Sequence, residues 1–141
     1  MNHRRTIRPL VLTFQIPAEA TEQVARSLGA RQRICPWTPD SDWALLDRDD
    51  VAALVLSDGG APASACAWIR RLRQRAPALP VIFLARRHSR EIELEVRRAG
   101  IHYYLHETAV ELELPLILDA LERHPHAVAA AAAVPAENES A

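Results

Sequence analysis

The stretch VAALVLSDGGAP, residues 51–62, joins a short apolar run to a carboxylate and then to a loop. The run has no polar side chain before Ser57, which is typical of a strand that is buried on both faces of a sheet. Asp58 follows, and the GGAP sequence after it interrupts regular structure. A strand that delivers an acid to its carboxyl end is one way in which α/β folds present a reactive carboxylate. The stretch therefore raises the question of whether Asp58 accepts a phosphoryl group.

On both sides of this stretch, apolar runs of strand length alternate with segments of helical periodicity. The pattern predicts five rounds of strand and then helix. Strands are expected at 10–14, 31–37, 51–58, 80–85 and 102–107, and helices at 18–29, 61–77, 89–100 and 111–124, with one short helix at 43–46. Pro115 is compatible with the last helix only near its first turn. We therefore expect a three-layer, doubly wound α/β domain with a parallel sheet and with its site at the carboxyl ends of the strands.

Composition limits the function classes. The chain has 141 residues, a formal net charge of −1 and no lysine, so it has no basic field for nucleic acid and no residue for lysine-dependent chemistry. No segment is long and apolar enough to span a membrane, and we expect a cytoplasmic protein. Residues 1–8 are expected to form a flexible basic arm, 9–124 the domain, and 125–141 an alanine-rich flexible tail. The three histidines near one end of the sheet (His88, His102 and His106) are expected at the surface, and no metal site or cofactor is predicted.

The segments around residues 8–124 resemble the receiver domain of bacterial two-component response regulators. ALVLSDGGAP resembles the third strand of that family, with Asp58 at the phosphoacceptor position and Pro62 at the following proline. LRQRAPALPVIFLA resembles its third helix and fourth strand, and RRAGIHYYL its fourth helix and fifth strand, with Tyr104 at the switch aromatic. The resemblance implies a flavodoxin-like, five-stranded parallel sheet in the order 2-1-3-4-5.

The residues that the family needs for phosphorylation are mostly different here. The acidic pair that binds Mg²⁺ in the family falls on Phe14 and Gln15, the phosphate-sensing hydroxyl falls on Ala85, and the lysine falls on Glu107. Phosphoryl transfer to a carboxylate needs cations to neutralise the transferring group, and a glutamate beside Asp58 has the wrong sign. The sequence therefore predicts a degenerate receiver, or pseudo-receiver, that does not depend on Mg²⁺.

Two carboxylates in one cleft need a neutralising cation, and the sequence offers one close by. We expect Arg86, just beyond the fourth strand, to pair with Asp58, with Glu107 or with both. A static charge pair would then occupy the pocket.

Three functions remain open from the sequence. The first is a stand-alone, non-enzymatic regulatory protein that binds a kinase, another regulator or itself. The second is a working phosphoacceptor, with Asp58 modified in a phosphorelay, and the third is a small-anion-binding module at the strand ends. Relatives dimerise through the face of the fourth helix, fifth strand and fifth helix, and the resemblance implies that this face carries six interface candidates: Arg90, Glu91, Arg97, Arg98, Tyr103 and Glu111. No nucleic-acid or membrane partner is predicted.

Overall fold

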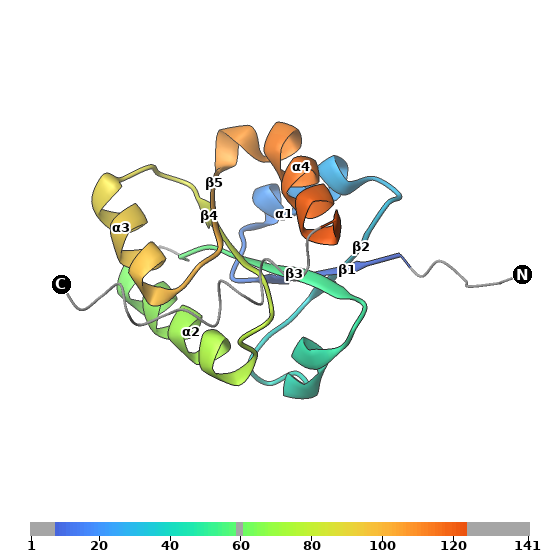
Figure 1. Cartoon of the computed structure of the whole chain (residues 1–141). Helices are drawn as coiled ribbons and strands as arrows, with labels where there is room; N and C mark the ends of the chain where they lie inside the picture. Colours follow the sequence, from blue (N-terminus) through green and yellow to red (C-terminus); the bar gives the residue numbers. More distant parts are fainter. Residues whose placement is uncertain (1–7, 59–60, 124–141) are drawn as a thin grey trace, which may run out of the picture.

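The computed structural model describes residues 8–58 and 61–123, and its centre is a parallel five-stranded sheet (Figure 1). The spatial order of the strands is β2-β1-β3-β4-β5, which confirms the expected fold class and order. The strands are β1 (Leu10–Phe14), β2 (Arg33–Pro36), β3 (Val51–Leu56), β4 (Val81–Ala85) and β5 (Tyr103–His106). The expected arm (1–8) and tail (125–141) lie outside the described residues except for Arg8.

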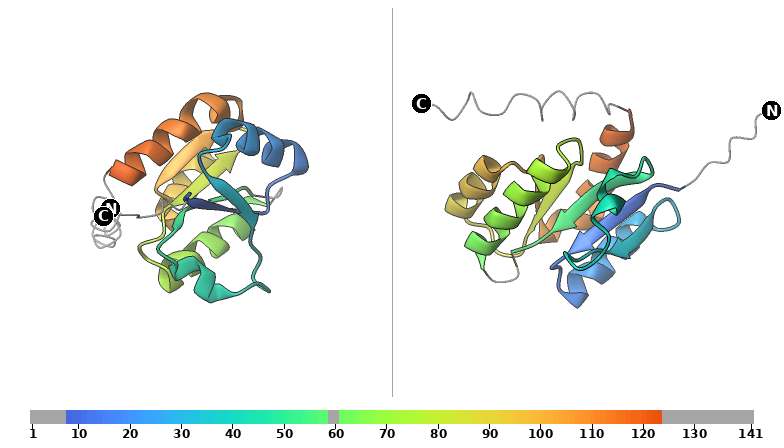
Figure 2. Two further views of the ribbon diagram at one scale, coloured as in Figure 1. Left: turned by 90° about the vertical axis from the view of Figure 1, so that its right-hand side faces the viewer. Right: turned by 90° about the horizontal axis from the view of Figure 1, so that it is seen from below.

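Helices cover both faces of the sheet (Figure 2). Helices α1 (Ala18–Leu28) and α4 (Val110–Arg123) cover one face, while α2 (Pro62–Arg75) and α3 (Arg90–Ala99) cover the other. Two short 3₁₀ helices, η1 (Trp43–Asp47) and η2 (Glu107–Ala109), complete the described part. The strands are apolar along their whole length because alternate side chains enter two different cores. Leu12 of β1, for example, packs with α2 and α3, whereas its neighbour Val11 packs with α1 and α4.

The boundaries of α3 follow its end residues. Ser89 begins the helix, and its Oγ accepts a hydrogen bond from the backbone N–H of Ile92 at 3.2 Å. Gly100 ends it with φ 120°, a backbone conformation that favours glycine. A Cβ atom at this position would lie 2.6 Å from Nη1 of Arg73, which donates a hydrogen bond to the Gly100 carbonyl at 2.9 Å. Gly100 therefore allows α2 and α3 to approach closely.

The short helix expected at 43–46 is present as the 3₁₀ helix η1, which is capped by Asp42. Two local predictions differ from the structure. Pro115 lies in the second turn of α4, where the missing N–H is tolerated because four residues of the helix (Val110, Leu114, Leu118 and Leu121) are buried. His102 is not a surface residue, since it is half-buried and its Nδ1 accepts a hydrogen bond from the N–H of Val81 at 3.0 Å. Among the described residues, no helix is long and apolar enough to cross a membrane.

Candidate functional site

The carboxyl ends of the strands bring the predicted site residues to one edge of the sheet. Phe14 ends β1 and pairs with Leu56 of β3, two residues before Asp58. Ala85 ends β4 and pairs with His106 of β5, next to Glu107. Parallel strands place their carboxyl ends at the same edge, which is where doubly wound folds carry their sites. We call this edge, with residues 14, 15, 58, 85, 86 and 107, the candidate site.

Asp58 is half-buried directly after β3. Its backbone carbonyl accepts a hydrogen bond from the N–H of Ala61 at 2.8 Å, which links the end of β3 to the residue before α2. Ser57 beside it is fully buried, and its Oγ has no hydrogen-bond partner among residues 8–58 and 61–123. The Asp58 carboxylate thus stands at the position that the resemblance assigns to a phosphoacceptor.

Phe14 stands at the first of the two positions that are acidic in the receiver family, and its aromatic ring lies in the core. It is buried and makes edge-to-face contacts with Trp37 and Trp68, both with ring centroids 5.3 Å apart. Trp37 also contacts Trp43, with centroids 4.9 Å apart. We call these four residues the aromatic cluster; such contacts each add roughly 0.5–1.5 kcal/mol beyond the burial of apolar area. The first metal-ligand position is therefore part of the hydrophobic core.

Arg71 of α2 covers the outer side of the aromatic cluster. Its guanidinium carbon lies 5.2 Å from the ring centroid of Trp43 and 4.8 Å from that of Trp68. A guanidinium over the face of an indole is attracted by the negative charge of the ring face. The cluster therefore continues from the buried Phe14 to the surface of α2.

Gln15, the second of the two ligand positions, is exposed and has φ 60°. A residue other than glycine in this region costs roughly 1–2 kcal/mol. Its amide carries no charge, so it does not replace the missing carboxylate. The backbone strain at Gln15 marks the sharp departure of the chain from β1 towards α1.

Arg86 links three elements at the candidate site. Its Nε lies 3.8 Å from Oε1 of Glu107, and its Nη2 lies 3.4 Å from Oε1 of Glu19 near the start of α1. These side chains are partly exposed to solvent, so each pair contributes between 0 and about 1 kcal/mol. The structure thus brings Arg86 and Glu107 together, and the pairing of Arg86 with Asp58 stays a prediction.

The donor set at the candidate site does not fit Mg²⁺, which the fold family implies. Mg²⁺ prefers several oxygen ligands, usually carboxylates and waters, in octahedral geometry. The side chain of Phe14 has no oxygen, the side chain of Gln15 is neutral, and the carboxylate of Glu107 lies beside the cationic Arg86. In the described part of the chain, no three histidine, cysteine, aspartate or glutamate side chains are grouped so that they could hold a metal ion.

Tyr104, at the position of the family's switch aromatic, is half-buried against α3. Its ring stacks on Phe83 with centroids 5.8 Å apart, and its hydroxyl lies 3.3 Å from Nδ1 of His88. Burial raises the pKa of this hydroxyl, and the negative charge of Asp58 also raises it. The ring is therefore fixed on one side by the core and on the other by a loop histidine.

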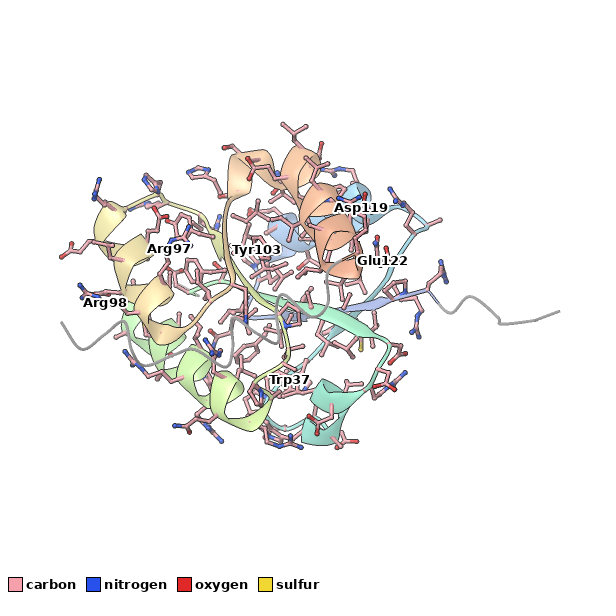
Figure 3. The ribbon with its side chains drawn as sticks, in the orientation of Figure 1. Trp37, Arg97, Arg98, Tyr103, Asp119 and Glu122 are labelled. Carbon is pink, nitrogen blue, oxygen red and sulfur yellow. The ribbon has the colours of Figure 1, made fainter. Side chains whose placement is uncertain are left out.

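The six interface candidates lie on three elements but do not all point the same way. Arg97 and Arg98 lie on α3 and Tyr103 on β5 (Figure 3). Arg90 and Glu91 are exposed in the first turn of α3. Glu111 instead pairs with Arg26 of α1 at 3.4 Å, so it faces α1. At α4, two leucines are exposed at the surface, Leu112 at 72% and Leu116 at 63%.

Sequence reasoning did not identify several neighbours of the candidate site. Trp37 contacts Phe14 and Glu19 contacts Arg86, each from a segment distant in the sequence, while Arg71 reaches only the aromatic cluster. Trp68 was the partial exception, because its helical spacing with Ala65, Ile69 and Leu72 predicts the buried face of α2. No local signal connects Glu19 to Arg86, since they meet only when α1 and β4 are in place.

Comparison with solved structures identifies similar folds at low sequence identity. The CheY-like protein TadZ from Pseudomonas aeruginosa has 24% identity and a TM-score of 0.69, over 80% of this chain and 98% of that chain. The signal receiver domain of an HD-domain-containing protein from Pseudomonas fluorescens has 18% identity and a TM-score of 0.68, over 86% and 99%. A protein from Burkholderia pseudomallei, described as pilus assembly-related, has 22% identity and a TM-score of 0.58, over 92% and 93%.

Sequence comparison alone is silent: no family model and no curated protein matches the chain. All three structural likenesses have under 25% identity, so they establish the fold and leave the activity to the site. The strand order, the two helical layers and these likenesses agree. The chain has the fold of a CheY-like response-regulator receiver domain.

Proposed function

We propose that this protein is a cytoplasmic pseudo-receiver, a non-enzymatic regulatory domain that acts by protein–protein contact without Mg²⁺-dependent phosphorylation. The observation that supports it most strongly is Phe14, which fills the first metal-ligand position with an aromatic side chain buried against Trp37 and Trp68. The pairing of Arg86 with Glu107 supports the proposal further, because the position of the family's lysine carries an acid that is already paired with a cation. In the reaction that the resemblance implies, a divalent cation and a lysine neutralise the phosphoryl group. This chain has no lysine, and its described residues include no group of side chains suited to hold the cation.

The direct test is chemical phosphorylation. The wild-type protein is incubated with acetyl phosphate and Mg²⁺, and its intact mass is measured, with Asp58→Asn as the matched control. We expect no added phosphate on either protein. A phosphate on the wild type that is absent from Asp58→Asn would overturn the proposal and establish the alternative, a phosphoacceptor regulator modified at Asp58.

The alternative of a small-anion-binding module is tested separately. Arg86 follows β4 directly, and its guanidinium already faces the carboxylates of Glu19 and Glu107. A thermal-shift titration with inorganic phosphate and with dicarboxylates is expected to show no concentration-dependent rise in Tm. A saturable rise that Arg86→Ala abolishes would favour the binding module.

We propose the face of α3, β5 and α4 as the partner-binding surface, with a second copy of this chain, a kinase or another regulator as its partner. Arg90 and Arg98 of α3 have no ion pair with a described residue, and Leu112 and Leu116 of α4 are exposed. Such a mixture of arginine and apolar side chains suits a protein interface. Light scattering at high concentration tests self-association, with Leu112→Ser/Leu116→Ser as the disrupting variant. A strictly monomeric mass would rule out the homodimer. One structural neighbour is described as pilus assembly-related, so pilus-assembly proteins are the first hetero-partners to test.

A further inference from the structure

A cavity of about 330 Å³ lies at the amino edge of the sheet, opposite to the candidate site. Its apolar lining comes from the beginnings of three strands and from the end of α4: Pro9, Val51, Ala52, Pro80, Leu118 and Leu121. Three acidic residues also line it, namely Asp49, Asp50 and Glu122. The last of these projects from the final turn of α4 (Figure 3). We call this space the amino-edge cavity.

The charges around the amino-edge cavity are not balanced. Asp50 is held by Arg33 at 2.7 Å and by Nε of Arg48 at 2.9 Å, and these contacts keep the pKa of its carboxyl low. Asp49 and Glu122 form no ion pair with any residue of 8–58 or 61–123. Two carboxylates without an ion pair among the described residues thus remain beside an apolar lining, and the second arginine at Asp50 offsets part of their charge. A ligand that fits this combination carries positive charge and an apolar group.

The residues that lead into β1 have this composition and are tethered at the cavity. Residues 1–7, MNHRRTI, contain Arg4, Arg5 and Ile7 and no acidic residue. Pro9 lines the cavity, and Arg8 before it is anchored because its carbonyl accepts a hydrogen bond from Nε of Arg33 at 3.0 Å. An extended chain spans about 3.3–3.6 Å per residue, so Arg4 reaches across a space of this size.

The other end of the described chain is a weaker match. The described chain ends at Arg123, one residue after Glu122 of the cavity lining, and the sequence that follows, 124–141, contains two glutamates and no arginine. Glutamates beside Asp49 and Glu122 would repel them. Charge complementarity therefore selects the arm over the tail.

We propose that the amino-edge cavity is a binding site for a basic peptide segment with an apolar side chain, and that residues 1–7 of this chain are its occupant. Arg4 and Arg5 pair with Asp49 and Glu122, and Ile7 covers the apolar lining. Exposed ion pairs are individually weak, but a short tether raises the effective concentration of the arm to the millimolar range. A partner with a similar basic segment competes with the arm for this site.

The test compares amide NMR spectra of the full chain, of a variant lacking residues 2–7, and of Arg4→Ser/Arg5→Ser. The reporters are the amides of Leu118, Leu121 and Glu122, because they are distant from the arm in sequence. We expect both variants to shift these three amides. Titration of a synthetic peptide of residues 1–8 into the arm-deleted protein should return the shifts saturably, and the same peptide with both arginines replaced by serine should bind about fivefold more weakly.

Two controls distinguish the occupants. A protein that ends at Arg123 should keep the full-chain shifts at Leu118 and Leu121, whose amides lie before the truncation. Asp49→Asn/Glu122→Gln should lose the response to the peptide while keeping the remaining spectrum. If arm deletion leaves the reporters unchanged, or if only removal of residues 124–141 moves them, the proposal is overturned.

Discussion

Nε of Arg86 lies 3.8 Å from Oε1 of Glu107, at the position where the resemblance to receiver domains implies a lysine. The ion pair joins the segment after β4 to η2, and Glu19 approaches the same guanidinium from α1 at 3.4 Å. The positions of cation and anion are therefore the reverse of those in the receiver family. The lysine position carries the acid Glu107, and the cation Arg86 comes from the loop after β4.

The first prediction concerns this pair. Glu107→Lys places two cations together, so we expect the free energy of unfolding to fall by up to about 1 kcal/mol, as for a partly exposed pair. Urea unfolding at low and high salt measures the loss, which should shrink at high salt because screening weakens the repulsion. Glu107→Gln is the matched control and should show the smaller effect. Equal losses for both variants, independent of salt, would contradict the ion pair.

The second prediction concerns the metal-ligand positions. Phe14→Asp removes a buried ring from the aromatic cluster and buries a carboxylate, so we expect a loss of more than about 3 kcal/mol of stability. Gln15→Asp makes the same acid at an exposed position, and its effect should stay within about 0.5 kcal/mol. Denaturant unfolding of both variants measures the difference. Similar stabilities for the two would show that Phe14 is not part of the core.

The third prediction concerns the approach of α2 to α3. Gly100→Ala places a Cβ 2.6 Å from Nη1 of Arg73 at a φ of 120°, so we expect a loss of about 1–3 kcal/mol from strain and clash together. Gly100→Ala should cost less in an Arg73→Ala background than in the wild type, because the clash is then absent and only the backbone strain remains; Arg73→Ala alone is the reference, since it also removes the hydrogen bond to the Gly100 carbonyl. Thermal and urea unfolding report both. An equal loss in both backgrounds would assign the whole effect to the backbone.

The fourth prediction concerns pH. Burial, helped by the positive charge of Arg73, lowers the pKa of His102 to about 4 from an ordinary value of 6.5. The unfolded chain therefore binds this proton more readily than the folded chain, so His102 reduces stability as the pH falls from 6.5 towards 4. His102→Gln should flatten the loss of stability between pH 7 and pH 5, a range above the titration of most carboxylates. His88→Gln, at an exposed position, should leave it unchanged.

Direct titration of the imidazole checks the same point. The NMR signals of the His102 ring should titrate below pH 5. A midpoint near 6.5 would show that the ring is solvated and not held against Val81.

The parallel sheet and most helix boundaries were predictable from the alternation of apolar runs and helical segments, and the order of the strands followed from the resemblance to receiver domains. Continuous apolar runs, a Ser89 cap and the glycine at position 100 are local signals, and each was confirmed at its place. The candidate site was predictable only as a set of positions at one sheet edge. Its contacts were not, because Glu19 reaches Arg86, and Trp37 reaches Phe14, only after distant segments have packed.

The histidines illustrate the same limit. Nothing in the sequence around His102 indicates that its ring accepts a hydrogen bond from the N–H of Val81. That bond depends on the register between β4 and β5, which a single sequence does not specify.

The aromatic cluster around Phe14 has a consequence for how such a domain would transmit information. A switch needs two conformations of similar free energy, and a signal must bind one of them more tightly. With Phe14 in the core at the first metal-ligand position, Mg²⁺-dependent phosphorylation does not favour one conformation of the proposed pseudo-receiver over another. The amount of complex with a partner would then follow the concentration of the protein and its dissociation constant, so that synthesis and degradation take the place of a chemical on–off cycle.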